Sequence, residues 1–292
     1  MIKSISKIAY PALSLLFLAA CQSTAQTALN NPQKITGLKT PESVVQAKDG
    51  RIFVSEIGEF GKNGDGQISV IGLDGKISVF ASGLDDPKGL AIIGENLYVT
   101  DNTKVLKIGS DGKSSLFVAA DKFPQTPIFL NDIEADTQGN LYVSDSGDIM
   151  GKGGGAAIYK ISPDATVKLL INDQQDARIK APNGLLADDT GNFLLEVDFT
   201  SGILYSLNTQ TGQLSDIAEG FGGGDGIVHH SNGNMYVSDW KNGKVFSVNT
   251  KGDVTLLKDG YKASADIAIT KDEKYLLVPD MKAGELDFIS LQ

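Results

Sequence analysis

Six positions along this 292-residue chain share a sequence context but differ in their chemistry. Each is the second residue of a recurring pattern that ends on an acid, as in LNDIEADTQGNLYVSD and GDGIVHHSNGNMYVSD. Five carry oxygen donors and one carries an ammonium group: the six residues are Glu42, Lys88, Asn131, Asn183, Asp225 and Asp266. If the patterns place these residues around one axis, their oxygens meet at a site that can bind a hard cation or activate water.

The spacing of these positions indicates the architecture that brings them together. Neighbouring copies lie 46, 43, 52, 42 and 41 residues apart, and such periods with several short strands per unit are typical of propeller blades. Within one unit, residues 141–144 alternate between apolar and polar, and hairpin turns such as residues 162–164 separate the strand-like runs. We therefore predict an all-β fold, a six-bladed β-propeller over residues 33–292.

The last unit is one strand short, and the start of the domain supplies a candidate for the missing strand. Residues 33–37 (QKITG) resemble the fourth strands of other units, so we expect this N-terminal strand to complete the last blade and close the ring. The variable residues then lie at one end of the channel. His229 and His230 follow Asp225 by four and five residues, or roughly 13 to 16 Å at about 3.3 Å per residue, so we expect them near the opposite face and outside the site.

The first 20 residues have the pattern of a bacterial lipoprotein signal. Lysines precede a short apolar run, and the sequence LAAC ends at Cys21, the only cysteine in the chain. An ordinary secretory peptide with an incidental cysteine is the alternative. We predict a signal peptide over residues 1–20, and over residues 21–32 a lipidated Cys21 with a flexible tether, in the bacterial cell envelope. By analogy with enterobacterial sorting, Gln22 favours the outer membrane facing the periplasm.

Composition limits the possible partners. Thirty-six acidic residues against 26 basic ones give a net charge of −10, which repels phosphate backbones and makes nucleic acid an unsuitable partner. With one cysteine the fold cannot contain an internal disulfide, and a domain of this length buries enough apolar surface to fold without one. We expect a monomer that contacts the membrane only through its lipid anchor.

Four of the variable residues have the chemistry of a calcium site. Glu42 and Asp225 offer carboxylates, and Asn131 and Asn183 offer amide oxygens, which together with water suit Ca²⁺, whereas zinc prefers His or Cys. The alternative is that these side chains cap strand ends along the channel rim. That alternative suits any one of them, but it explains their convergence poorly, because Lys88 shows that other residue types are possible at the same position.

The sequences PES, FLND, APNG and GGDG, in this order and spacing, resemble those of the gluconolactonase and regucalcin family. Diisopropyl fluorophosphatase and the paraoxonases are relatives of this family of six-bladed propellers. The resemblance covers residues 33–292 and implies one Ca²⁺ at the channel mouth, held by Glu42, Asn131, Asn183 and Asp225. Members of these families hydrolyse lactones or organophosphates.

The resemblance also implies a mechanism. Ca²⁺ acts as a Lewis acid on the carbonyl of a bound lactone. Asp225 serves as a ligand and either as the general base for water or as the nucleophile, and both readings stay open. Asp266 points into the same mouth and is either a second base or structural. Lys88 either offsets the negative charge or contacts an anionic substrate.

Departures from the family pattern bear on the substrate. Gluconolactonases carry an arginine that binds sugar hydroxyls where this chain has Phe129, which argues against an aldonolactone. Val228 replaces an acid that holds a second calcium in fluorophosphatases, so we expect one ion. Several large apolar residues lie on or near loops of the mouth: Phe60, Phe129, Met150, Phe199, Phe221, Trp240 and Met281. We expect Lys88, Phe129, Met150 and Trp240 to line the substrate pocket.

These observations favour a Ca²⁺-dependent hydrolase, a lactonase or esterase that acts on a small and moderately apolar substrate. The alternative is a non-catalytic periplasmic propeller that binds a protein, a peptide or a glycan, with the metal structural or absent. A propeller alone implies no activity. The four oxygen donors favour the first hypothesis, because a pure scaffold has no reason to place them together.

Overall fold

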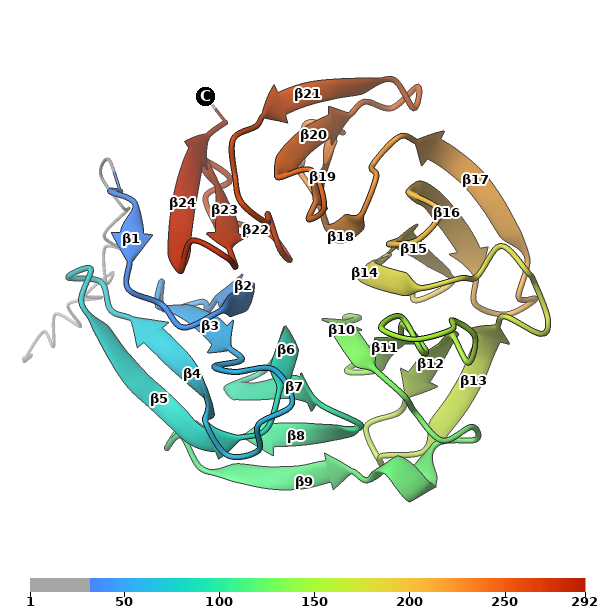
Figure 1. Cartoon of the computed structure of the whole chain (residues 1–292), viewed down its shortest axis with the longest axis horizontal. Coiled ribbons are helices and arrows are strands. Elements are labelled where there is room, and N and C mark those ends of the chain that lie inside the picture. Colours follow the sequence, from blue (N-terminus) through green and yellow to red (C-terminus); the bar gives the residue numbers. More distant parts are fainter. Residues whose placement is uncertain (1–31, 292) are drawn as a thin grey trace, which may run out of the picture.

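The computed structural model describes residues 32–291, which form six four-stranded antiparallel sheets around a central axis (Figure 1). Cys21 and the predicted signal peptide lie outside the described residues. Blade 1 contains β2 (Pro41–Gln46), β3 (Ile52–Glu56), β4 (Gly66–Ile71) and β5 (Ile77–Leu84). Blade 2 contains β6 (Pro87–Ile93), β7 (Asn96–Asp101), β8 (Lys104–Ile108) and β9 (Ser114–Val118). Blade 3 contains β10 (Leu130–Ala135), β11 (Leu141–Asp145), β12 (Ala157–Ile161) and β13 (Val167–Asn172).

The second half of the ring repeats this plan. Blade 4 contains β14 (Pro182–Ala187), β15 (Phe193–Asp198), β16 (Ile203–Asn208) and β17 (Leu214–Glu219). Blade 5 contains β18 (Gly224–His229), β19 (Met235–Asp239), β20 (Lys244–Val248) and β21 (Val254–Lys258). Blade 6 contains β22 (Ala268–Ile269), β23 (Tyr275–Asp280), β24 (Glu285–Ser290) and β1 (Ile35–Thr36). The described residues also include one short 3₁₀ turn, η1 (Ala120–Lys122), and within them no helix is long and apolar enough to cross a membrane.

Ring closure occurs as predicted, with β1 as the outermost strand of blade 6 beside β24 (Figure 1). The paired part is short: Ile35 lies opposite Leu286, and Thr36 lies opposite Glu285. Further contacts extend the seam, because Leu38 donates its backbone N–H to the Gly284 carbonyl and packs among buried residues of blades 1 and 6. The N-terminal strand therefore joins the two ends of the chain into one ring.

The acid that ends each recurring pattern holds the loop that leads into the innermost strand. Asp198 accepts backbone N–H groups from Lys180 and Ala181 ahead of β14, and from Thr200 and Ser201 behind β15. The equivalent acids accept backbone N–H groups in the same way: they are Glu56, Asp101, Asp145, Asp239 and Asp280. The feature shared by all six patterns thus serves the blades themselves.

Blade 6 departs from the other blades at its inner edge. Its regular innermost strand is reduced to β22, although the sequence pattern predicts a start near Ala265. Pro279 stands on β23 beside this segment and has no N–H to donate to it. The Ala265 carbonyl accepts instead from the Ser238 hydroxyl of blade 5 at 2.8 Å, and the Asp266 N–H donates to the Glu42 carbonyl of blade 1 at 3.0 Å. Neighbouring blades therefore replace part of the missing ladder.

Glu196 occupies a position where the other five blades have valine. It lies on β15 opposite Leu185 and Tyr205, inside the hydrophobic layer between blades 3 and 4. The equivalent valines are all buried: Val54, Val99, Val143, Val237 and Val278. The Glu196 carboxyl is fully buried, and neither oxygen has a hydrogen-bond partner. Removal from water, reinforced by the charge of Asp198, raises the pKa of Glu196 well above its usual range.

Replacing Glu196 with valine should stabilise the fold, with a gain of about 1 to 3 kcal/mol at pH 7 from removing an unsatisfied buried group. Burial raises the pKa of Glu196 in the folded state. The destabilisation that Glu196 causes is therefore smallest below the unfolded-state pKa of about 4.3, and it grows as the pH rises above that value. Thermal melts of both proteins at pH 4 and pH 7 should therefore show the larger difference at pH 7. The reciprocal change in blade 3, Val143→Glu, should destabilise. An equal difference at both pH values would contradict burial of the neutral acid.

Candidate functional site

The six variable residues lie where the innermost strands begin, at the end of the channel that we call the mouth. Glu42, Lys88, Asn131, Asn183 and Asp225 are the second residues of β2, β6, β10, β14 and β18, and Asp266 lies just ahead of β22. In each of blades 1 to 5 the pairing of the innermost strand is interrupted at this position. Such β-bulges redirect side chains, and here the bulged residue is the variable one.

Hydroxyl groups on the second strands satisfy backbone groups that these irregularities leave free. Ser55, Ser144 and Ser238 accept the N–H groups of Ser43, Asp132 and Gly226 at 2.8–2.9 Å. These serines stand one residue before the closing acid in their patterns. The bulge at each variable residue is therefore supported by a second-strand hydroxyl in blades 1, 3 and 5.

Glycine lets the innermost strands of neighbouring blades approach closely. A Cβ atom on Gly184 would lie 2.1 Å from the Asp225 carbonyl oxygen, and one on Gly226 would lie 2.4 Å from Asp266 Oδ1. Both distances are far below van der Waals contact. The absence of a side chain after Asn183 and after Asp225 therefore brings blades 4, 5 and 6 together at the mouth.

The predicted calcium ligands are buried and incompletely satisfied. Glu42, Asn131, Asn183 and Asp225 are each 2–5% exposed. Glu42 Oε2 and Asp225 Oδ1 are buried oxygens without a hydrogen-bond partner. Asn131 donates its Nδ2–H to Ser146 Oγ at 3.1 Å, and the Asn183 side chain donates to Asp225. The amide oxygens of Asn131 and Asn183 take no part in these two hydrogen bonds. The donor set therefore fits a hard cation that accepts oxygen ligands.

Burial and mutual repulsion disfavour the charged forms of the ionisable groups at the mouth. Burial raises the pKa values of Glu42, Asp225 and Asp266 well above their usual range, and mutual repulsion among the carboxylates adds to this. Lys88 favours ionised Glu42, but burial lowers the pKa of Lys88 itself. Lys88 donates to the Asp86 carbonyl at 3.2 Å. One buried ammonium thus faces several buried acids, an arrangement that a bound cation stabilises.

Two further acids on β10 were not among the predicted site residues. Asp132 accepts the N–H groups of Ile133 and Leu185, and burial raises its pKa to about 6. Burial and the charge of Asp132 raise the pKa of Glu134 to about 8. Their alternate spacing in the sequence Asn-Asp-Ile-Glu was the available signal, because residues two apart on a strand share a face. Acidic side chains therefore extend along the channel from the mouth.

The predicted pocket residues have different environments. The Phe129 ring is half-buried, with Lys88 Nζ 4.4 Å from its centroid, so these two residues form one unit in the wall. Trp240 is half-buried and donates its Nε1–H to Met281 Sδ at 3.3 Å. Met150 is 86% exposed on the loop after β11. Phe221 is fully buried between blades 4 and 5, where it packs on Phe246.

The histidines lie away from the mouth. His229 ends β18 and is exposed, and His230 Nδ1 accepts the Asn232 N–H within the following turn. His230 also lies 3.6 Å from Glu273, which belongs to the corresponding turn of blade 6. This arrangement agrees with the expected position of both histidines on the opposite face.

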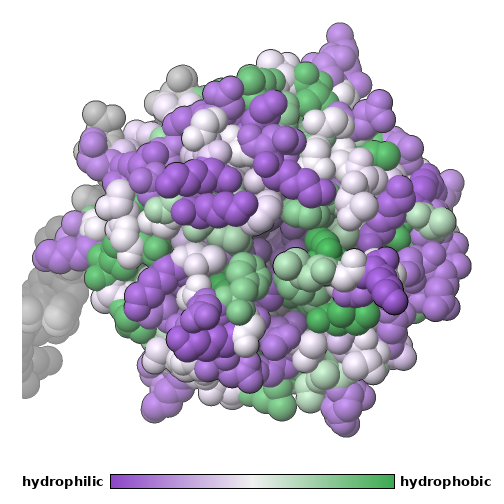
Figure 2. All heavy atoms as spheres, in the orientation of Figure 1, coloured by the Kyte–Doolittle hydropathy of each residue, from purple (hydrophilic) through white to green (hydrophobic). Residues whose placement is uncertain are grey.

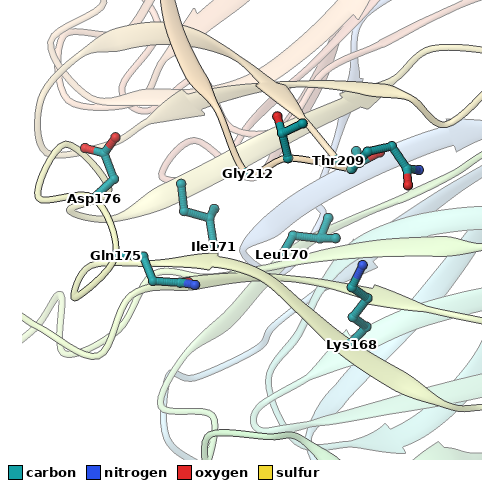
Figure 3. A pocket seen from close by; sticks show the side chains of 9 residues that line it. Lys168, Leu170, Ile171, Gln175, Asp176, Thr209 and Gly212 are labelled. Atoms are coloured by element: carbon teal, nitrogen blue, oxygen red, sulfur yellow. The ribbon is translucent and has the colours of Figure 1, made fainter.

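A hollow of about 320 Å³ lies in the outer part of the ring, away from the innermost strands. Figure 3 shows its lining, which comes from β13, the loop after it, and the turn between β16 and β17. Of the lining acids and bases, Asp176 is already paired with Arg178 at 2.7 Å. The groups suited to chemistry are at the mouth instead. Within residues 32–291 no cluster of three or more His, Cys, Asp or Glu side chains is arranged to hold a metal, so a cation at the mouth requires the amide oxygens as well.

Comparison with known proteins agrees with this architecture. The family model described as SMP-30/Gluconolactonase/LRE-like region matches residues 92–259, more than half of the chain. The chain belongs to the SMP-30/gluconolactonase/LRE-like family. A comparison with curated proteins finds no match. Family membership makes this a gluconolactonase-like propeller, as the sequence resemblance predicts.

Solved structures show the same fold at low identity. One is a gluconolactonase from Xanthomonas campestris, described as important in glucose secondary metabolic pathways, with 14% identity over 87% of this chain and 88% of that chain, and a TM-score of 0.69. Another is a chain from the crystal structure of a nidogen/laminin complex, with 21% identity over 72% of this chain and 76% of that chain, and a TM-score of 0.60. At these identities the likeness concerns the fold alone.

Substitution of Gly184 by alanine should disturb the packing of blades 4 and 5 at the mouth. The new Cβ would collide with the Asp225 carbonyl oxygen, so we expect a loss of about 1 to 3 kcal/mol from overpacking, measured by urea unfolding. Gly109→Ala is the matched control, because its nearest neighbour is a flexible Asp111 side chain at 3.1 Å. Equal unfolding midpoints for Gly184→Ala and the wild type would show that the blades can separate without cost.

Proposed function

We propose that this protein is a Ca²⁺-dependent hydrolase of a lactone or ester, with its active site at the channel mouth. The observation that carries the proposal is the pair of buried carboxylate oxygens without partners, Glu42 Oε2 and Asp225 Oδ1, in a ring that also presents two amide side chains. A buried carboxylate without a partner is costly. A ligand that supplies positive charge removes that cost, and family membership supports the same site.

Glu42, Asn131, Asn183 and Asp225 would hold the ion. Bound there, Ca²⁺ supplies a Lewis acid that stabilises the oxyanion formed on an ester carbonyl. Each ligand comes from a different blade, so the rigid ring fixes their separation before any ion binds. The donor set contains two carboxylates and two amides and no sulfur or imidazole, which favours calcium over zinc.

Asp225 is the residue that we place at the reacting atoms. Its carboxylate accepts a hydrogen bond from Asn183, which favours the ionised form against the effect of burial. An ionised Asp225 either takes a proton from an attacking water and passes it to the leaving oxygen, or attacks the carbonyl itself to form an anhydride. In the second route a water molecule protonates the leaving oxygen and hydrolyses the anhydride, which regenerates the carboxylate. Asp266 accepts a hydrogen bond from the Ser43 hydroxyl at 2.5 Å, and in this proposal it is either a second base or structural.

The rival function is a propeller that binds a protein, a peptide or a glycan without catalysis. The similar fold in the nidogen/laminin complex belongs to a protein that assembles with another protein, and the propeller fold accommodates both roles. The buried donors favour the enzyme, because a protein-binding face requires accessible groups. Asn183 and Asp225 are instead only 2% and 4% exposed.

Removing calcium should destabilise the protein, and the ligands should differ in their effects. Calcium at about 100 times its dissociation constant adds roughly 2.7 kcal/mol of stability, so a chelator should lower the melting temperature. Asp225→Asn should abolish hydrolysis in a screen of lactones, aryl esters and phosphotriesters, even in excess calcium, because it removes a ligand and the proposed base together. Asn131→Ala should recover activity in part as calcium is added.

A double replacement of His229 and His230 is the matched control, because both lie on the opposite face, and it should leave turnover nearly unchanged. Metal analysis of the purified protein provides the second measurement. Absence of calcium together with full activity of Asp225→Asn would overturn the enzymatic proposal in favour of the binding propeller.

We also propose that a lipid on Cys21 anchors the protein in the bacterial envelope, on the basis of the LAAC sequence. Cys21→Ser should block lipidation and move the protein out of the membrane fraction, or leave its precursor unprocessed, as judged by fractionation and mass spectrometry. A mature wild-type protein whose mass shows no acyl groups would contradict the anchor.

A further inference from the structure

The rim of the mouth is apolar on one side only. The residue after each closing acid occupies an equivalent place in every blade. Its backbone N–H donates to a backbone carbonyl in the loop ahead of the innermost strand of the same blade. In blades 4, 5, 6 and 1 these residues are apolar, and in blades 2 and 3 they are polar: in blade order from 4 they are Phe199, Trp240, Met281, Ile57, Asn102 and Ser146. Ile57 and Met281 are buried, so Phe199 and Trp240 of blades 4 and 5 form the accessible apolar surface of the rim, which we call the apolar arc.

Aromatic rings and lysines are paired along this arc. The Phe199 and Trp240 rings lie 6.0 Å apart at 57°. Lys241 Nζ lies 4.3 Å from the centroid of Phe199, and Lys282 Nζ lies 4.0 Å from that of Trp240. Both distances suit cation–π contact, which positions an ammonium group over an apolar surface. In the space-filling view of Figure 2, both hydrophobic and hydrophilic side chains lie beside the centre of the ring.

The two ammonium groups remain able to bind an anion. Lys241 and Lys282 are exposed, and within residues 32–291 neither forms a salt bridge with an acid. Lys241 uses one donor on the Phe199 carbonyl at 3.1 Å, and an ammonium group has three. Deeper in the channel lie the acidic residues Glu42, Asp132 and Asp225. At the rim, an anionic group is therefore attracted to Lys241 and Lys282.

We propose that the natural substrate is an amphipathic ester or lactone that carries a carboxylate. Its apolar part lies on Phe199 and Trp240, and its carboxylate binds Lys241 and Lys282. Its ester group then extends from the rim towards Asp225. The identity of the reacting group rests on the proposed function. The recognition of an anionic, apolar ligand rests on the arc alone, so the two can be tested separately.

Binding can be followed without turnover, because Trp240 is the only tryptophan in the chain. The full-length protein is titrated with 4-phenylbutyrate and with 4-phenylbutan-1-ol, which share the apolar part and differ in charge, while tryptophan fluorescence is recorded. We expect tighter binding of the acid, and a preference that declines with added salt. In the double variant Lys241→Met and Lys282→Met, the preference for the acid should fall about three- to tenfold, as expected for exposed charge pairs.

Lys152→Met is the matched control, since Lys152 is an exposed lysine of the loop after β11 and should leave the preference unchanged. Equal affinities for the acid and the alcohol in the wild type would overturn the inference, as would an unchanged preference in the double variant. Turnover of phenyl acetate and 4-acetoxybenzoate distinguishes the two proposals. Hydrolysis of both esters without preference would overturn this inference alone. Lysine-dependent binding of the acid without hydrolysis of any ester would support it and overturn the enzymatic proposal.

Discussion

The structure depends on one interaction that is repeated in every blade, a buried carboxylate that accepts backbone N–H groups from the loop ahead of the innermost strand. Asp198 accepts two such groups, from Lys180 and Ala181. It accepts two more from Thr200 and Ser201, and so fixes both the approach to β14 and the departure from β15. Hydrogen bonds to an ionised acceptor are stronger than those between neutral groups. In blades 1 to 5 the strand that follows this loop begins one residue before the variable position, so these acids determine where those side chains of the mouth begin.

Close approach of the innermost strands then creates an electrostatic constraint. Gly184 and Gly226 bring neighbouring backbones into contact, which places several acids together out of water with Lys88 as the opposing charge. Such a cluster destabilises a fold unless a ligand or protonation relieves it. The same rigidity that makes the cluster costly also keeps its geometry constant, a requirement for orienting an ester at a metal.

The ring and its site positions could be predicted because their signals are local and periodic. The spacing of the copies gives six blades, and the QKITG segment gives the closing strand. Glu196 could not be assigned in this way. A glutamate two residues before the closing acid fits a strand that alternates in polarity, and only the packing of blade 3 on blade 4 shows that both carboxyl oxygens lack partners. The lysine pairs at the rim were also missed, because stacking of Lys282 on Trp240 joins loops of different blades.

Closure by β1 has a consequence for how the protein reaches its native state. The seam joins Lys34 to Glu285, a separation of 251 residues, so its contacts are among the most non-local in the chain. Blades built from adjacent hairpins can form early, whereas the ring can close only after the last strand has been synthesised. Until then the edges of the first and last blades stay unpaired and open to association with other chains. The interval between completion of blade 5 and arrival of β24 is therefore the stage at which this protein is most exposed to misassembly.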